Sequence, residues 1–519
     1  MTERYSLGIE FGSTRIKAVI INESMDVIAV GSHTWENHLV DGIWSYALED
    51  AWAGVQKAYA RLAEEYKKAT GTALTSVSTI GISAMMHGYL AFNETGELLV
   101  PFRTWRNTIT HHASEELTKE LGFTIPQRWS IAHLYQAVLN GEPHVSQISF
   151  LTTLSGYVHW KLTGEKILGV GDASGVFPID AAHGWDGPRL GKTQAKLDAA
   201  GAGITLAGIL PEVRDAGADA GILTAEGALL LDPAGVLQAG IPLCPPEGDA
   251  GTGMVATNAV APRTGNISAG TSIFAMIVLE RELADLHPEI DMVTTPAGDP
   301  VAMVHCNNGA SEIDAWAQIF SQFAAKAGCE LDTNQVFATL FGAALDGDKD
   351  GGGILAYNYL AGEPITGLEE GRPLILRTPD SKLNLANFMR TLIMSSFGTL
   401  SLGMRILESE NVEVDSMFAH GGIFATKGVA QSLMAAALST PVSVGETAAE
   451  GGAWGMAVLA SYALDSRELS LADFLVSVVF ADAQIETIAP DPDDVEGYTR
   501  FLEAYEKAIP VLRTAVETS

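Results

Sequence analysis

The chain has 519 residues, of which 47% are hydrophobic and 53 are glycine, and its formal net charge is −32 at pH 7. A chain of this length has room for two to four domains with large buried cores. So acidic a surface repels DNA, RNA and anionic membranes, and we therefore expect neither nucleic acid nor membrane as a partner.

The first predicted element is an antiparallel meander of three strands. Leu7 and Ile9 alternate with smaller or polar neighbours, residues 16–21 are apolar and rich in β-branched side chains, and residues 27–30 form a third apolar run. Turn residues separate the three runs. The meander therefore predicts a sheet at the start of the chain.

The first turn of this meander, Gly12-Ser13-Thr14, is a candidate phosphate loop. It offers backbone N–H groups and two hydroxyls between Glu10 at the end of one strand and Lys17 on the next. Amide and hydroxyl donors with a cation bind phosphates, and a nearby carboxylate holds Mg²⁺ through water. The alternative is an ordinary hairpin turn with a surface lysine.

A helix with an apolar stripe is predicted over residues 48–69, and a parallel-type strand over 77–82. Further along, residues 241–244 predict a strand that a Pro-Pro pair ends, and residues 254–261 predict a helix. Asp249 stands in the glycine-rich turn between them, an open position that suits a general base.

Two alternatives to the general base remain at this turn. Asp249 could be a helix N-cap. Gly251-x-Gly253-x-x-Ala256 could be a dinucleotide fingerprint, although no acidic residue follows about 20 positions later.

The pattern of the first meander is repeated about halfway along the chain. Residues 265–280 again read as a short strand, a hydroxyl-rich turn at Gly270-Thr271-Ser272, and an apolar strand. Two matched turns indicate a duplicated domain whose two loops face each other across a cleft. The expected domains are residues 1–258 and 259–519. Two unrelated hairpins are the alternative.

The C-terminal half also predicts a buried helix over 383–408, a strand over 416–419, and a helix over 429–438. The pair Gly421-Gly422 follows that strand, and backbone this bare allows close approach by a flat ring such as adenine. A polar tail from about residue 488 ends in a helix.

Missing motifs argue against two classes of enzyme, the P-loop ATPases and the α/β hydrolases. There is no G-x-x-x-x-G-K-S/T loop and no G-x-S-x-G elbow. His111-His112 with Glu115-Glu116 could bind a metal, but a solvated helix start is favoured. The cysteines show no metal or disulfide spacing, the N-terminus lacks a signal-peptide layout, and no apolar run is long enough for a membrane helix. We expect a soluble cytoplasmic protein.

Taken in chain order, these motifs resemble the FGGY family of carbohydrate kinases, and the resemblance extends from Leu7 to about Ala463. The motifs that carry it, besides Glu10 to Lys17, are Gly81-Ile82-Ser83 with Met86-His87-Gly88, Pro101 with Trp105, Leu162-Thr163-Gly164, Asp172-Ala173-Ser174, Leu210-Pro211, Gly248-Asp249, Gly270-Thr271-Ser272, Tyr359 to Glu363, and Gly421-Gly422 with Gln431.

The resemblance implies an α/β fold of two similar actin-like (hexokinase-like, ribonuclease-H-like) domains, with ATP and Mg²⁺ as cofactors and a small sugar as substrate. It implies Asp249 as the base and Glu10 and Asp249 as metal ligands. Sugar contacts are expected from Met86, His87, Trp105, Arg106, Asp172 and Asp249. Nucleotide contacts are expected from Gly12, Ser13, Thr14, Lys17, Gly270, Thr271, Ser272, Gly421, Gly422 and Gln431. Family members are often homodimers.

The Met86-His87 pair indicates a xylulose-like ketopentose. Three departures from the family pattern keep other interpretations open: Glu10 replaces the usual Asp, Arg106-Asn107 follows the Trp, and Ala435-Ala436 replaces an Ala-Asp pair. The alternatives are a kinase for another pentulose or polyol such as ribulose or a tetritol, and a catalytically weak sugar and ATP sensor. A chaperone-type ATPase is disfavoured, since no β-rich peptide-binding domain follows the second half.

Overall fold

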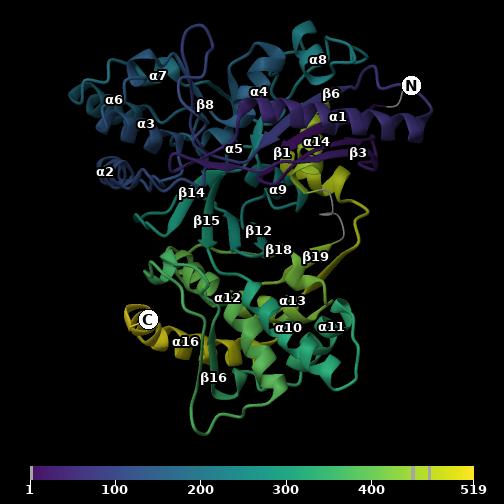
Figure 1. The fold of residues 1–519 in the computed structure, drawn as a ribbon, viewed down its shortest axis with the longest axis vertical. Coiled ribbons are helices and arrows are strands. Elements are labelled where there is room, and N and C mark those ends of the chain that lie inside the picture. Colours follow the sequence, from purple (N-terminus) through teal and green to yellow (C-terminus); the bar gives the residue numbers. More distant parts are fainter. Residues whose placement is uncertain (1–3, 446–450, 466–468, 519) are drawn as a thin grey trace. The chain divides into compact units, whose positions relative to one another are not determined.

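The computed structural model describes residues 4–445, 451–465 and 469–518. The chain forms two compact units, each built around a sheet with helices packed on it (Figure 1). Each unit is assembled from three stretches of chain, which are 1–261, 291–301 and 447–483 for unit 1, and 262–290, 302–446 and 484–519 for unit 2.

The sheet of unit 1 confirms the predicted meander. Its strand order is β11-β6-β1-β2-β3, in which β1, β2 and β3 are antiparallel, while β6 runs parallel to β1 and β11 parallel to β6. The strands are β1 (Ser6–Phe11), β2 (Arg15–Ile21), β3 (Val27–Thr34), β6 (Thr79–Ala84) and β11 (Glu247–Gly248). Shorter pairs are β4 (His38–Val40) with β5 (Ile43–Ser45), β7 (Leu90–Phe92) with β8 (Phe150–Thr152), and β9 (Ile167–Gly169) with β10 (Glu212–Arg214).

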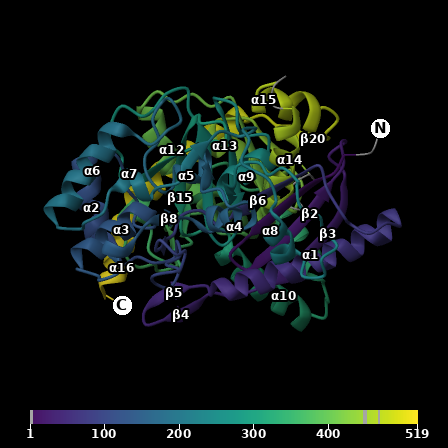
Figure 2. The same ribbon diagram turned by 90° about the horizontal axis from the view of Figure 1, so that it is seen from above.

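The predicted helix over 48–69 is α1 (Leu48–Thr70), which lies along β3 (Figure 2). Its buried stripe, which includes Ala51, Val55 and Leu62, recurs every three to four residues and so faces the sheet. The other helices are α2 (His111–Leu121), α3 (Ser130–Leu139), α4 (Leu154–Thr163), α5 (Val170–Ala173), α6 (Gly187–Ala199), α7 (Leu206–Ile209), α8 (Ala225–Leu231), α9 (Asp249–Ala256), α14 (Gly451–Asp465) and α15 (Leu471–Phe474).

The segment before α9 differs from the prediction. Residues 241–244 form only isolated bridges, of Leu243 with Ile80 and of Pro242 with Ile222, because the prolines here have no N–H to donate to a ladder. The strand instead follows the Pro-Pro pair, and α9 begins at Asp249, earlier than the predicted 254. Gly248 is the N-cap, so the N-cap alternative for Asp249 is wrong.

Unit 2 repeats the strand plan of unit 1, which confirms the predicted α/β fold with two similar sheets. Strands β13, β12, β18 and β19 are neighbours in this order, with β12 antiparallel to β13 and parallel to β18, as β1 is to β2 and β6. The strands are β12 (Thr264–Ala269), β13 (Ile273–Val278), β18 (Ser416–His420), β19 (Val442–Gly445), β20 (Ile485–Ile488), β16 (Ile354–Tyr357) and β17 (Leu374–Arg377). The boundary between the units falls within β14 (Ile290–Thr294) and β15 (Pro300–Cys306).

The helices of unit 2 are α10 (Ser311–Lys326), α11 (Thr333–Ala344), α12 (Leu385–Ser409), α13 (Val429–Leu438) and α16 (Pro492–Thr518). Of these, α12 and α13 are close to their predicted bounds, α16 is the helix expected in the tail, and α10 and α11 were not predicted. Most residues of α12 are buried, as its apolar sequence predicted.

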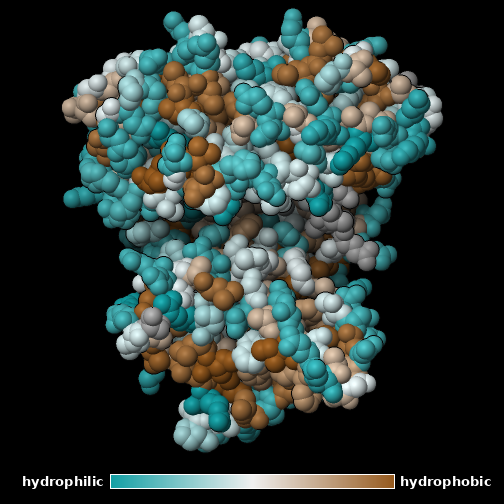
Figure 3. All heavy atoms as spheres, viewed as in Figure 1, coloured by the Kyte–Doolittle hydropathy of each residue, from teal (hydrophilic) through white to brown (hydrophobic). Residues whose placement is uncertain are grey.

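The surface is mixed on the face drawn in Figure 3, where hydrophilic side chains surround smaller hydrophobic groups. The most exposed large apolar side chain among the described residues is Phe323 of α10, at 72%. No helix within the described stretches is long and apolar enough to cross a membrane. All three cysteines are free.

Candidate active site

The first predicted phosphate loop is the turn between β1 and β2. The amide of Gly12 donates to the Arg15 carbonyl over 3.0 Å and closes the turn. Thr14 is exposed, and Lys17 lies opposite Glu10 in the antiparallel register. The strands therefore bring the acid, the hydroxyls and the cation to one end of the sheet.

Glu10 and Asp249 are brought together in unit 1. Asp249 is the first residue of α9, and its Oδ1 accepts a hydrogen bond of 3.0 Å from the amide of Met86. Burial raises the pKa of Asp249 above its ordinary value. Burial, and then the charge of Asp249, raise the pKa of Glu10 to about 7, against an opposing effect of Lys17.

The donor set of this pair fits Mg²⁺, which prefers carboxylate oxygens and keeps several waters. A divalent cation would relieve the repulsion that raises the pKa of Glu10. Within the described residues no group of three or more His, Cys, Asp or Glu side chains could hold a metal. The exposed His111 and His112 form ion pairs with Glu115 and Glu116 of their own helix, which supports a solvated helix start.

Asp172, which the sequence predicted as a sugar contact, is buried within the electrostatic influence of Asp249, in an acidic cluster that the sequence did not predict. Its Oδ2 accepts hydrogen bonds from the hydroxyls of Thr153, at 2.6 Å, and Ser155. Asp172 is 1% exposed, and its Oδ1 has no partner among the described residues. Burial is the main cause that raises the pKa of Asp172 to about 7.

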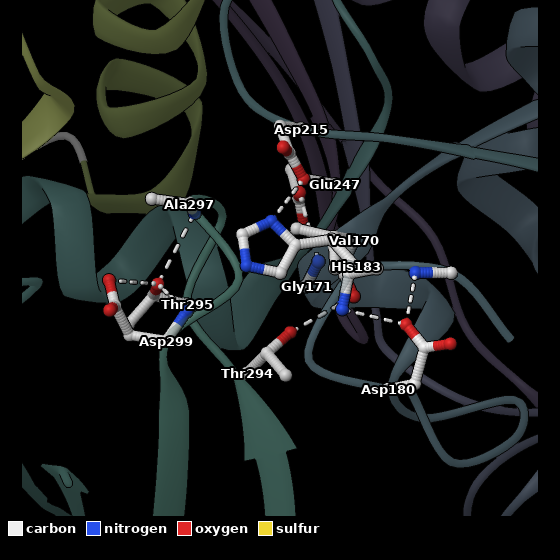
Figure 4. Close-up of polar contacts among 12 residues, drawn as sticks. Val170, Gly171, Asp180, His183, Asp215, Glu247, Thr294, Thr295, Ala297 and Asp299 are labelled. Atoms are coloured by element: carbon white, nitrogen blue, oxygen red, sulfur yellow. Dashed lines mark hydrogen bonds and ion pairs between the residues drawn. The ribbon is translucent and has the colours of Figure 1, made fainter. Parts of the chain in front are cut away.

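The second member of the cluster is Glu247. Its carboxylate accepts hydrogen bonds from the amides of Gly171 at 3.2 Å and Asp172 at 2.9 Å. Burial, and then the charge of Asp172, raise the pKa of Glu247 to about 8. Figure 4 shows Glu247 beside Gly171 and Val170, where the Thr294 hydroxyl donates to the Val170 carbonyl. The cluster therefore supports the segment just before Asp249.

His87 is buried with its ring in a defined protonation state. Its Nδ1 lies 3.2 Å from the Gly175 carbonyl, which can only accept, so Nδ1 carries the proton. Burial lowers the pKa of His87 well below its ordinary value. The ring is therefore neutral at pH 7, and Nε2 is a hydrogen-bond acceptor. Met86 beside it is also buried.

Trp105 and Arg106 lie on a loop that is tied to the β4–β5 hairpin. Asn107 exchanges hydrogen bonds with the backbone of Trp44, at 2.8 and 2.9 Å. The Arg106 guanidinium stacks over the Trp44 ring at 4.2 Å and donates to Asn37. Trp105 is 40% exposed. Trp44 is thus a further member of this group that motif analysis missed.

The second predicted loop, Gly270-Thr271-Ser272, lies in unit 2 between β12 and β13. The amides of Ala310 and Gly309 donate to the carbonyls of Gly270 at 2.9 Å and Thr271 at 2.8 Å. The amide of Gly270 donates to the Ser272 carbonyl at 2.9 Å, two residues along the chain, whereas the bond that closes the first loop spans three residues, from Gly12 to Arg15.

A cavity of 750 Å³ opens beside this second loop, within unit 2. Gly270, Thr271 and Gly422 line it, together with apolar side chains of α11 such as Phe337 and Phe341. Its size and its mixture of apolar walls with a few polar groups are typical of a small-molecule site. The aromatic residues of α11 carried no motif, and only their helical spacing could have indicated them.

Two residues that the sequence predicted as nucleotide contacts, Gly421 and Gln431, are not among the residues that line this cavity. The Gln431 amide nitrogen donates to the carbonyls of Val442 and Glu486, both at 2.9 Å, and Gln431 does not line the cavity. Gly421 has a φ of 124°, and a Cβ there would lie 1.9 Å from the Ala269 carbonyl oxygen. The structure thus gives Gly421 and Gln431 a part in holding the strands.

Several known proteins resemble this chain. A xylulose kinase of Klebsiella pneumoniae is 24% identical over 209 residues, which are 37% of this chain and 41% of that protein. A glycerol kinase of Thermococcus gammatolerans is 24% identical over 227 residues, 41% of this chain and 43% of that protein. The alignments thus span about two fifths of these curated relatives.

Solved structures match over the whole chain. The xylulose kinase of Rhodospirillum rubrum has a TM-score of 0.80 at 19% identity, over 98% of this chain and 99% of that one. The gluconate kinase of Lactobacillus acidophilus has a TM-score of 0.78 at 16% identity, with both chains fully covered. The N-terminal domain model of the FGGY carbohydrate kinases matches residues 5–255, and the C-terminal domain model matches residues 265–464. The chain therefore belongs to the FGGY family of carbohydrate kinases.

Proposed function

We propose that this chain transfers the γ-phosphate of ATP to a hydroxyl of a small sugar, a ketopentose such as xylulose. The observation that carries the proposal is the position of Asp249. Its carboxylate stands at the start of α9, held by the Met86 amide and coupled to Glu10 at the edge of the first loop.

Asp249 has the properties of a general base. The Met86 amide donates to Oδ1 and fixes the orientation of the carboxylate, which can accept the proton of a sugar hydroxyl. Burial raises the pKa of Asp249, which makes its carboxylate a stronger base than one in water. In-line phosphoryl transfer needs little more from the protein than this base, correct positioning and charge neutralisation.

The first loop suits the phosphates of ATP. The amides and hydroxyls of Ser13 and Thr14, with the ammonium of Lys17, are the donors that phosphate oxygens accept. Glu10 and Asp249 are the residues that would hold Mg²⁺. When bound, the metal supplies neutralisation of the phosphate charge. In unit 2, the 750 Å³ cavity with Phe337 and Phe341 suits a flat, largely apolar base such as adenine.

The sugar assignment rests on His87 and on the relatives. A neutral His87 offers Nε2 as an acceptor for a sugar hydroxyl, and Arg106 offers donors. Xylulose kinases occur among both the sequence relatives and the structural neighbours. A glycerol kinase and a gluconate kinase occur there too, so a panel of acceptors is needed.

The test is ADP release with Mg²⁺ and ATP against pentuloses, pentoses, tetritols, glycerol and gluconate, for the wild type and for Asp249→Asn. We expect one ketose to stimulate ADP release strongly. Loss of the base should reduce kcat at least about 100-fold and leave ATP affinity nearly unchanged.

The matched control is Asp198→Asn at the exposed end of α6, which should keep full activity. ATP binding without stimulation by any acceptor would overturn the kinase proposal and favour a sugar and ATP sensor. Full turnover of Asp249→Asn would remove Asp249 as the base.

A further inference from the structure

The carbonyls of the first loop are each held by a donor from the residues that directly follow β3 and β5. Trp35 Nε1 donates to the Gly12 carbonyl at 2.7 Å, and the Tyr46 hydroxyl donates to the Ser13 carbonyl at 2.6 Å. The Trp35 amide donates to the Thr14 carbonyl at 3.2 Å. Three consecutive carbonyls of an exposed turn are thus turned toward two aromatic residues.

The two aromatic side chains are rigidly placed. The rings of Trp35 and Tyr46 stack with centroids 4.2 Å apart and an interplanar angle of 26°. Trp35 also packs edge-on against Phe11, and Tyr46 packs against Phe102. Trp35 is 6% exposed and Tyr46 is 2% exposed, so neither ring is free to move away from the loop.

The orientation of the carbonyls decides where the amides point. Within a planar trans peptide, the C=O of one residue and the N–H of the next point in opposite directions. Because the Gly12 and Ser13 carbonyls face Trp35 and Tyr46, the amides of Ser13 and Thr14 point away from these rings. Neither amide has a hydrogen-bond acceptor among the described residues.

The carbonyls of the corresponding loop in unit 2 are also held by hydrogen bonds, but the donors are different. There the carbonyls of Gly270 and Thr271 are held by backbone amides of residues 309 and 310. Asn308 and Asn358 fix that supporting segment, since the Asn358 amide donates to the Gly309 carbonyl at 2.6 Å. Of these two loops, the first has two carbonyls that side chains hold, so there each of these donors can be removed by a substitution.

Tyr46 also lies next to the loop that carries Arg106. Arg106 opposes the effect of burial on the pKa of Tyr46, and burial still raises that pKa above its ordinary value. The hydroxyl therefore stays protonated and donates to Ser13. Arg106 in turn stacks on Trp44, two residues before Tyr46.

We propose that Trp35 and Tyr46 are positioning residues that hold the first loop with the Ser13 and Thr14 amides free for the phosphates of ATP. The inference rests on the proposed function, since it assumes that the loop receives phosphate. Neither residue touches the reacting atoms, and both act through the loop carbonyls.

The test measures the dissociation constants of ATP and adenosine by calorimetry for Tyr46→Phe and Trp35→Phe. Each variant keeps a ring in the stack and removes one donor. We expect ATP binding to weaken about 3- to 10-fold in each, the usual effect of one lost hydrogen bond, and adenosine binding to stay unchanged. The control is Tyr157→Phe, which removes a buried hydroxyl that accepts a 3.0 Å bond from Trp52.

The outcomes separate the two proposals. Weaker ATP binding in Tyr46→Phe and Trp35→Phe, with Tyr157→Phe like the wild type, supports the positioning role. Equal ATP affinity in all four proteins overturns it while the proposed function stands. A matched loss for ATP and adenosine, or a loss that Tyr157→Phe shares, indicates general destabilisation and also overturns it. A wild type that binds no ATP overturns the proposed function itself.

Discussion

The environment of Glu247 is unusual for a glutamate. A glutamate is rarely buried without a partner, yet Glu247 is 1% exposed and the charge that raises its pKa is that of another carboxylate, Asp172. Backbone amides of Gly171 and Asp172 satisfy its oxygens. They do not offset the cost of burial fully, and so its pKa rises to about 8.

The raised pKa predicts how stability depends on pH. A carboxyl with a higher pKa in the folded state binds its proton more tightly there, so protonation favours folding. This contribution of Glu247 is complete below the unfolded pKa near 4.5 and is lost as the pH rises through about 8. We expect the Tm of the wild type to fall between pH 6 and pH 9, by about 3 °C or more.

The variant that tests this is Glu247→Gln, which removes the titration and keeps one oxygen as an acceptor, for either the Gly171 or the Asp172 amide. Its Tm should fall less between pH 6 and pH 9 than that of the wild type in calorimetry. Glu94→Gln, at an exposed loop position, is the control and should follow the wild type. Parallel Tm curves for Glu247→Gln and the wild type would contradict the assigned protonation.

At the scale of elements, the turn after β18 depends on one glycine of its pair. Gly421 has a φ of 124° and leaves no room for a Cβ against the Ala269 carbonyl, just before the second loop. The φ of Gly422 lies outside the positive range that favours glycine, and a Cβ added at Gly422 would have no atom within 4 Å. The two glycines look alike in the sequence, but only Gly421 must remain a glycine.

Gly421→Ala should lower the free energy of unfolding by about 2 kcal/mol or more, because the backbone strain and the clash add together. It should also weaken adenosine binding, since displacement of Ala269 moves Gly270 at the cavity wall. Gly422→Ala is the matched control for stability and should shift Tm by about 1 °C at most. Thermal unfolding of both variants decides this, and equal Tm values would refute the distinction.

Elements with local signals could be predicted from the sequence. The meander, the two hydroxyl-rich turns and α13 follow from alternation, turn residues and helical spacing within about 30 residues. Glu247 could not be predicted as a buried acid, because its partners lie 75 and 76 positions earlier. Likewise, no local pattern shows that Trp35 and Tyr46 bond to the carbonyls of the first loop.

At the scale of the whole molecule, the chain returns to unit 1 after completing most of unit 2. Helix α14, from residue 451 onward, packs on β1, β6 and α9 of unit 1. Glycines make this contact close. A Cβ at Gly8 would lie 2.2 Å from the Ala453 carbonyl oxygen, and one at Gly455 would lie 2.1 Å from that of Thr252. The core of unit 1 is therefore completed by residues more than 180 positions beyond its first segment.

Gly8→Ala tests how strongly unit 1 depends on this late helix. The added methyl would meet backbone atoms of α14 rather than a flexible side chain, so the helix must move away from β1. Overpacking of this kind costs about 1–3 kcal/mol, and chemical denaturation of the full chain should show a lower midpoint for unit 1. Gly191→Ala, in open space on α6, should instead raise stability slightly through helix propensity. If Gly8→Ala unfolds at the wild-type midpoint, α14 contributes little to unit 1. If it unfolds earlier, the close contact between β1 and α14 contributes to the stability of unit 1.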